Sequence, residues 1–303
     1  MQSGFQLVSP KQVARVIGVS ESSLKRWCDQ GLIRMERTAG GHRKMQISEV
    51  IRFVREHNHK LVNPELLGLP PVSDHAELGL TRSRTRLVDA LLSGNELVAR
   101  QIIFDLYLAK HPLSVIFDEV VAAAFREIGE RWACEAADIY QERRSCGIAV
   151  RVLFDIRRVQ ASPDPAWPAV GGTIEGDLYE MPSTMVEMVL REAGFQATFL
   201  GTSLPIASLA RAVKETRPRL FWLSVSHIPD GFDLAAAVRV VADACNDIGA
   251  ALVVGGRALT SELRQQMTYS AFCDTMQHLE SFARTLKRSS APPSAGTTSA
   301  KSS

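Results

Sequence analysis

The strongest constraint on the fold is a change in the pattern of apolar residues after residue 168. Short apolar runs alternate there with helical patterns, in the order 169–174, 183–194, 197–200, 206–216, 220–225, 233–246 and 251–254. Strands that alternate with helices bury their apolar residues as a parallel sheet with helices on both faces. We therefore expect a doubly wound α/β domain over residues 165–288, with any ligand at the carboxyl ends of its strands.

A separate helical region precedes the expected sheet. Residues 82–160 have the pattern of four amphipathic helices, with breaks at Ser93-Gly94-Asn95, at His111-Pro112 and near Ala136-Asp138. Four helices with short connections predict a four-helix bundle, which we place at residues 81–160. Prolines and glycines without sustained periodicity make residues 61–80 an expected linker.

The first sixty residues predict a winged helix-turn-helix. Ser9 followed by Pro10 is typical of a helix start, and Gly18 ends that helix in a tight turn. A second helix is expected from Ser20 or Glu21 to about Gln30, and a third from Ser48 to about His59. Between them, residues 34–44 contain Gly-Gly at the centre of a hairpin. The order helix, turn, helix, hairpin, helix is that of a DNA-binding domain at residues 1–60.

Basic residues concentrate in this same segment. Residues 1–60 contain eleven Lys and Arg against five Asp and Glu, a net charge of +6, whereas the whole chain carries +2. The remaining residues therefore carry −4. This asymmetry favours a polyanionic partner for the N-terminal segment.

The second helix and the hairpin supply the candidate DNA contacts. The helix that enters the major groove reads base edges with its exposed side chains, and a glycine-tipped wing lets backbone approach the phosphates. The candidates are Ser22, Ser23, Lys25 and Arg26 on the helix, and Arg37, Gly41, His42 and Arg43 on the wing. The alternative interpretation is a solvated basic surface on an ordinary three-helix unit.

Other features exclude several classes of protein. Five scattered cysteines without a CxxC pair give no disulfide framework and no metal site. We see neither a signal peptide nor an apolar run of about 18 residues, so we expect a cytoplasmic protein without a membrane partner. No nucleophile or ordered triad accompanies the acidic residues, so we do not expect an enzyme. The polar tail, residues 289–303, is expected to be disordered.

The N-terminal motifs resemble the DNA-binding head of the MerR family. The matching segments are residues 8–14 (VSPKQVA), 27–33 (WCDQGLI) and 38–43 (TAGGHR). The resemblance covers roughly residues 5–60. It implies binding to double-stranded promoter DNA, usually as a symmetric dimer or tetramer.

The remainder resembles, over about residues 80–288, the cobalamin-binding unit of methionine synthase and of CarH/LitR-type light-sensing repressors. That unit is a four-helix cap followed by a flavodoxin-like sheet domain. Trp132 and Glu142 have the spacing of the family's W-x9-E-H motif, and Gly176-Asp177 matches the start of its G-D-x-H-x-x-G loop. The resemblance implies ligand contacts from Trp132, Glu142, Arg143, Asp177, Tyr179, Ser224, Ser226, Gly255 and Gly256.

Two departures from the motifs of the cobalamin-binding family bear on the cofactor. Tyr179 stands where the family has the histidine that binds cobalt, and Arg143 replaces the histidine beside the bundle glutamate. A phenol that ionises near pH 10 is a poor ligand compared with imidazole. If cobalamin, such as adenosylcobalamin, binds here, its lower protein ligand is therefore non-standard or absent.

We interpret the chain as a DNA-binding transcriptional regulator, either a repressor or an activator, and three roles for its C-terminal module stay open. The module binds cobalamin or another tetrapyrrole, binds a different small molecule, or only oligomerises or binds a protein partner. Two rivals from other classes are a cobalamin-dependent enzyme or methyl carrier, and an antirepressor-like interaction protein.

Overall fold

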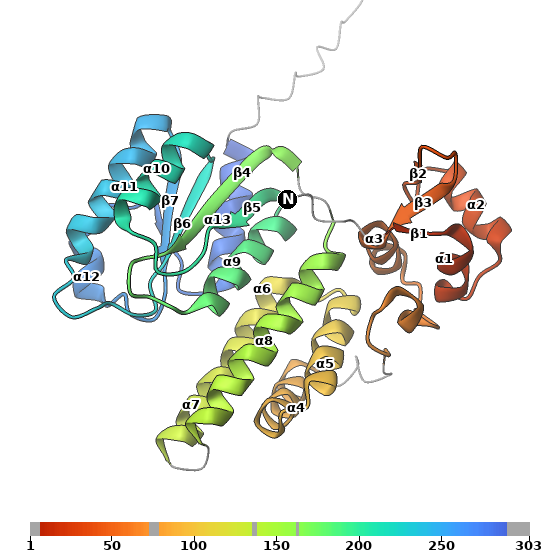
Figure 1. The fold of residues 1–303 in the computed structure, drawn as a ribbon, viewed down its shortest axis with the longest axis horizontal. Coiled ribbons are helices and arrows are strands. Elements are labelled where there is room, and N and C mark those ends of the chain that lie inside the picture. The colour runs from red at the N-terminus through yellow and green to blue at the C-terminus, as the bar shows by residue number, and fades with distance from the viewer. Residues whose placement is uncertain (1–6, 73–78, 135–137, 162–163, 290–303) are drawn as a thin grey trace, which may run out of the picture.

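The computed structural model describes residues 7–72, 79–134, 138–161 and 164–289 (Figure 1). The expected helix break at Ala136 and nearly all of the tail at 289–303 lie outside the described residues. Figure 1 shows a small N-terminal head, a helical region and a sheet covered by helices, in that order along the chain. Within the described part of the chain, no helix combines the length and apolar character needed to cross a membrane.

The head has the predicted order of elements. These are β1 (Leu7–Val8), α1 (Pro10–Ile17), α2 (Glu21–Asp29), β2 (Glu36–Arg37), β3 (Arg43–Gln46) and α3 (Ile47–His57). The three strands form an antiparallel sheet in the order β1-β3-β2. Ser9 begins α1 with a capping box to Gln12, and Gly18 ends it at φ 74°. The winged helix-turn-helix predicted from the sequence is confirmed.

The segment expected to be a linker is partly packed onto the head. Residues Pro64–Leu67 form a 3-10 turn, η1, and the Leu61 and Leu67 side chains are buried. The Val62 amide donates to the Val16 carbonyl at 2.7 Å. The sequence gives no signal for this packing, because prolines and glycines interrupt the segment and a 3-10 turn has no long apolar period. Residues 61–70 therefore behave as an extension of the head.

Four helical stretches follow, as predicted. They are α4 (Gly79–Ser93), α5 (Glu96–Leu108), a composite third stretch made of α6 (Leu113–Val115), η3 (Ile116–Ala122) and α7 (Ala123–Ala133), and α8 (Ile139–Val159). The η3 segment is a π-helix, a feature that often occurs near functional sites. Its buried residues include Phe117 and Val120, which belong to the core that the bundle shares with the head and one face of the sheet.

The last region is a parallel sheet in the order β5-β4-β6-β7-β8. Its strands are β4 (Asp164–Thr173), β5 (Phe195–Phe199), β6 (Leu220–Ser224), β7 (Ala251–Gly255) and β8 (Ala271–Phe272). This is the flavodoxin-like order, so the predicted doubly wound fold is confirmed. Because β4 is flanked by β5 and β6, the order reverses there, and ligands of such folds bind at the carboxyl ends of the strands near that reversal.

Helices cover the two faces of the sheet differently. Helices α9 (Glu180–Glu192) and α13 (Met276–Ser289) join the core shared with the bundle, whereas α10 (Ile206–Thr216) and α11 (Leu234–Ile248) pack in a second core on the other face. The sequence patterns had not identified α13, nor the short α12 (Ser261–Gln265) and β8. Helix α13 has an apolar face at helical spacing, made of Met276, Leu279, Phe282, Ala283 and Leu286, so its signal was present in the sequence and was missed.

The head is joined to the other two regions through Glu192, at the end of α9. Its carboxylate accepts from the Leu113 amide at 2.7 Å and pairs with Arg55 of α3 at 3.4 Å. The Arg55 guanidinium also lies 3.8 Å from the ring centre of Tyr107, a cation–π contact. Burial is the main cause that raises the pKa of Glu192.

Candidate functional site

The second helix of the head is fixed by one buried face. Leu24 is fully buried, and the Trp27 ring lies 4.9 Å from the ring of Phe53. The Ser20 hydroxyl caps the helix by accepting from the Ser23 amide at 3.1 Å. Lys25 and Arg26 are consequently exposed on the outer face, while Ser23 is half-buried beneath the cap.

The wing is a tight hairpin with exposed basic side chains. The Thr38 amide donates to the His42 carbonyl and the Gly41 amide to the Thr38 carbonyl, at 2.9 and 2.8 Å. Gly41 has φ +77°, and its missing side chain leaves open space around the tip. Arg37 and Arg43, which pair across the two strands, are exposed.

Helix and wing meet at one hollow of about 280 Å³, whose lining includes Ser22, Lys25 and Arg43. Among the described residues, no carboxylate lies within ion-pair distance of Lys25, Arg26, Arg37 or Arg43. Unpaired cations on a helix and an adjacent hairpin are suited to phosphate contacts. The structure thus brings Ser22 and Lys25 of the helix together with Arg43 of the wing on one basic surface, and the other candidates do not line the hollow.

A second candidate site is a cleft of about 400 Å³ at the carboxyl ends of β6 and β7. Four residues singled out from the sequence line it, namely Ser224, Ser226, Gly255 and Gly256. The opposite wall is the third helical stretch, with Asp118, Glu119 and Arg126. Asp118 also accepts from the Met276 and Gln277 amides, so its carboxylate fixes the start of α13.

Asp177 does not line the cleft and is fully buried beside it. One carboxylate oxygen accepts from the Tyr179 amide at 3.0 Å, and the other accepts from the Ser226 amide at 2.6 Å and the His227 amide at 3.3 Å. These bonds tie the loop after β4 to the loop after β6. The position of Asp177 indicates a role in holding the two loops together.

Tyr179 directly precedes α9 and does not line the cleft. The guanidinium of Arg257 lies 4.7 Å from the centre of its ring, and the Arg257 Nε donates to the Ser226 carbonyl at 3.3 Å. Arg257 lines the cleft and was missed from the sequence. Its only signal there is its place directly after Gly255-Gly256.

The remaining ligand candidates lie on the bundle and do not line the cleft. Trp132 is 48% exposed near the end of α7, Glu142 is half-buried and Arg143 is exposed. Burial raises the pKa of the Cys146 thiol, Glu142 raises it further, and Arg143 and Arg257 lower it. The first turns of α8 are therefore close enough to the cleft for the charge of Arg257 to act on Cys146. The Trp132 side chain, by contrast, has much of its surface in solvent.

Comparison with known proteins divides the chain in the same way. Residues 7–58 match a helix-turn-helix domain, and residues 83–153 match a B12 binding domain. The matches thus fall on the N-terminal head and on the helical bundle.

Curated relatives and a solved structure add to the comparison. Over 114 residues, 37% of this chain, it is 26% identical to the dimethylamine corrinoid protein of Methanosarcina barkeri and 25% identical to dimethylamine corrinoid protein 1 of Methanosarcina acetivorans. The chain spans about half (54%) of the length of these curated relatives. The structure of the Methanosarcina barkeri monomethylamine corrinoid protein superposes with a TM-score of 0.56 at 14% identity, covering 69% of this chain and all (100%) of that one. This likeness shows the shared fold of bundle and sheet.

The residues fit a corrinoid in one part and not in another. The cleft at β6 and β7 has a volume of about 400 Å³ and is lined by Ser224 and Ser226, whose hydroxyls suit a nucleotide tail, whereas the missing side chains of Gly255 and Gly256 make room for the Cys273 and Val225 backbone. The loop after β4 offers a phenol at Tyr179 in place of an imidazole. His227 is exposed and does not line the cleft. Among the described residues, no cluster of three His, Cys, Asp or Glu side chains could hold a metal ion.

Proposed function

We propose that this chain is a sequence-specific DNA-binding transcriptional regulator whose C-terminal module senses a ligand. The observation that carries the proposal is the unpaired basic surface of α2 and the wing, attached to a module with a cleft at its strand ends. In this proposal residues 1–60 bind promoter DNA, and residues 81–160 and 165–288 form the sensing module. The MerR-like motifs support this assignment, and two-fold operators favour a homodimer or tetramer.

Cobalamin or a related tetrapyrrole is the ligand that the relatives favour. Ser224 and Ser226 would hold its nucleotide tail beside Gly255 and Gly256, and Arg257 would lie at the rim next to Tyr179. When bound, a corrinoid supplies a cobalt centre and a large apolar ring. A ligand controls DNA binding only through different affinities for two states of the protein, so occupancy must favour one assembly over another.

The DNA-binding half is tested with selected duplexes and the full chain. Random double-stranded DNA is enriched on the protein, and fluorescence anisotropy then measures affinity against salt concentration. In an Arg26→Ala/Arg43→Ala double variant we expect weaker binding and a salt slope shallower by about 2, since each lost phosphate contact removes about 0.9. An Arg211→Ala/Arg239→Ala variant, with exposed arginines on α10 and α11, is the matched control. Equal slopes in both variants would contradict DNA binding by this surface.

The ligand half is tested by visible absorbance. The protein is incubated in the dark with adenosylcobalamin, methylcobalamin or hydroxocobalamin and then desalted. Retained corrin absorbance supports a corrinoid sensor with altered ligation, and illumination tests for a light response. A colourless protein that still binds DNA would overturn the corrinoid assignment and would leave the proposal of a DNA-binding regulator unchanged.

A cobalamin-independent regulator is the second candidate, and Tyr179 is the observation that favours it. A methyl carrier depends on its cobalt ligand, so the phenol at this position also disfavours the enzymatic rival.

A further inference from the structure

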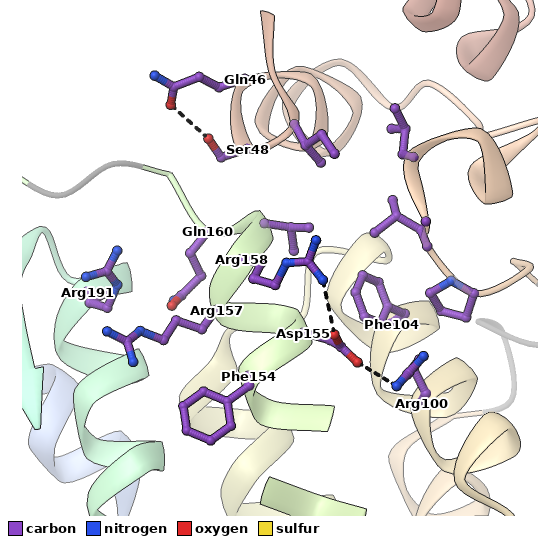
Figure 2. Close-up of a pocket in the computed structure, with 16 residues that line it drawn as sticks. Gln46, Ser48, Arg100, Phe104, Phe154, Asp155, Arg157, Arg158, Gln160 and Arg191 are labelled. Carbon is purple, nitrogen blue, oxygen red and sulfur yellow. Dashed lines mark hydrogen bonds and ion pairs between the residues drawn. The ribbon is translucent and has the colours of Figure 1, made fainter. Parts of the chain in front are cut away.

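A second cavity of about 400 Å³ lies where the head, the bundle and α9 meet (Figure 2). The head contributes Ser48 of α3 and the turn at Leu69 and Pro70. The bundle contributes Phe154 from α8, and α9 contributes Arg191. Its volume is within the range of small-molecule sites, which runs from about 300 to 1,000 Å³. It shares no lining residue with the cleft at the strand ends.

The cavity is rich in arginine and poor in acid. Four of its lining residues are arginines, at positions 100, 157, 158 and 191, and one is acidic, Asp155. Asp155 pairs with Arg100 at 2.9 Å and with Arg158 at 3.8 Å. Arg157 pairs at 2.9 Å with Glu187, a carboxylate buried just behind the wall.

Arg191 forms none of these ion pairs, although the charge of the buried Glu187, four residues earlier in α9, acts on its guanidinium. Among the described residues no carboxylate lies within ion-pair distance of it, and its Nε is buried without a hydrogen-bond partner. Burial lowers the pKa of this guanidinium, as expected for a desolvated cation. A buried N–H without a partner costs free energy that an acceptor on a ligand would recover.

Two further groups face the same space. Gln160 is 5% exposed, and its amide donates to the Met188 carbonyl, but its Oε1 atom is buried without a partner. Phe154 lines the cavity with 40% of its surface exposed, which is unusual for a phenylalanine. In Figure 2 Gln160, Arg157 and Arg191 lie close together, with Phe154 below them. A polar donor and acceptor set thus adjoins an uncovered aromatic ring.

We propose that this junction cavity binds a small organic anion, in which a phosphate or carboxylate is joined to a flat ring carrying a donor group. The anion meets the Arg191 guanidinium, for which bidentate phosphate or carboxylate binding is favoured. The ring packs on Phe154, and its donor reaches the Gln160 Oε1 atom. Because the walls come from the head, the bundle and α9, occupancy fixes the orientation of the head, so this ligand and DNA influence each other's affinity.

Adenosine monophosphate is a probe with all three features, and isothermal titration of the full chain measures its binding. We expect adenosine, which lacks the phosphate, to bind at least about tenfold more weakly. Arg191→Gln should weaken adenosine monophosphate by a similar factor, Arg191→Lys by less, and Arg211→Gln, an exposed arginine on α10, not at all. Phe154→Ala should weaken the nucleotide and leave the binding of inorganic phosphate unchanged.

Two outcomes would overturn this inference. One is the absence of binding by adenosine monophosphate. The other is unchanged affinity in the Arg191→Gln variant, when thermal unfolding shows that this variant is folded. The titration contains no DNA and no corrinoid, so either failure leaves the proposed regulator untouched.

Discussion

The head and the cleft use their motif residues in opposite ways. On the head, Lys25, Arg26, Arg37 and Arg43 are exposed and without ion-pair partners among the described residues, and the fold is held by other residues such as Leu24 and Met45. In the cleft region, Asp177 and Gly256 belong to motifs and also hold the fold together. A change on the head surface should therefore affect binding, whereas a change beside the cleft should affect stability first.

Two glycines with positive φ test this contrast most strongly. Gly256 has φ +121°, and an added Cβ would lie 2.2 Å from the Val225 carbonyl oxygen. Gly256→Ala should cost about 4 kcal/mol from backbone strain and overlap together. Gly41 has φ +77° with nothing within 4 Å of the added Cβ, so Gly41→Ala should cost only about 1 kcal/mol.

Urea unfolding followed by circular dichroism measures both variants. Hydrogen exchange of the β6 and β7 amides then shows whether the loss in Gly256→Ala is local to the sheet edge. Equal losses at the two glycines would remove the distinction between the two regions.

Asp177→Asn is expected to have the next largest effect. The amide keeps one acceptor oxygen but places an NH₂ group against backbone amides, so at least one of the three bonds from Tyr179, Ser226 and His227 is lost. Charge-assisted bonds of this kind contribute about 2 kcal/mol each. Urea unfolding should show a loss of about that size, while anisotropy should give unchanged DNA affinity. A stable variant that only fails to bind cobalamin would instead assign Asp177 to the ligand.

Ser20→Ala makes the matching change on the head. It removes the hydroxyl that caps α2 through the Ser23 amide, and loss of such a cap costs about 1 kcal/mol. Fraying should raise hydrogen exchange in the first turn of α2 and weaken DNA binding several-fold, because that turn carries Ser22 and Ser23. If DNA affinity stayed constant, base contacts would have to come from elsewhere than the start of this helix.

The same contrast explains how much the sequence could predict. Capping residues, the Gly41 wing and the period of the strands are local signals, so the winged head and the alternation of strands and helices followed from them. The cleft residues Ser224, Ser226 and Gly255 came from the resemblance to the cobalamin-binding unit, and the structure places them at strand ends, where doubly wound folds bind ligands.

Tertiary contacts without a local signal could not be predicted. Arg257 is recognised only once the fold places it over Tyr179. The packing of residues 61–70 and the junction cavity depend on surfaces more than thirty residues apart, such as Leu69 and Arg191. The motif around Asp177 predicts a ligand contact, whereas its three amide donors are visible only in the folded chain.

The joint between the two regions gives the smallest expected effect, and it appears as a dependence on pH. Burial raises the pKa of Glu192 above its ordinary value of 4.5, so the folded state holds the proton more tightly than the unfolded state. The stability that this group contributes is fully present below pH 4.5 and is lost as the pH rises through the raised pKa.

Glu192→Gln keeps an acceptor for the Leu113 amide but cannot ionise. Urea unfolding over the mildly acidic range should therefore show wild type losing stability relative to this variant. A constant difference between the two proteins would mean that the Glu192 carboxylate is not desolvated, and that the head is not packed against α9 and the bundle through this residue.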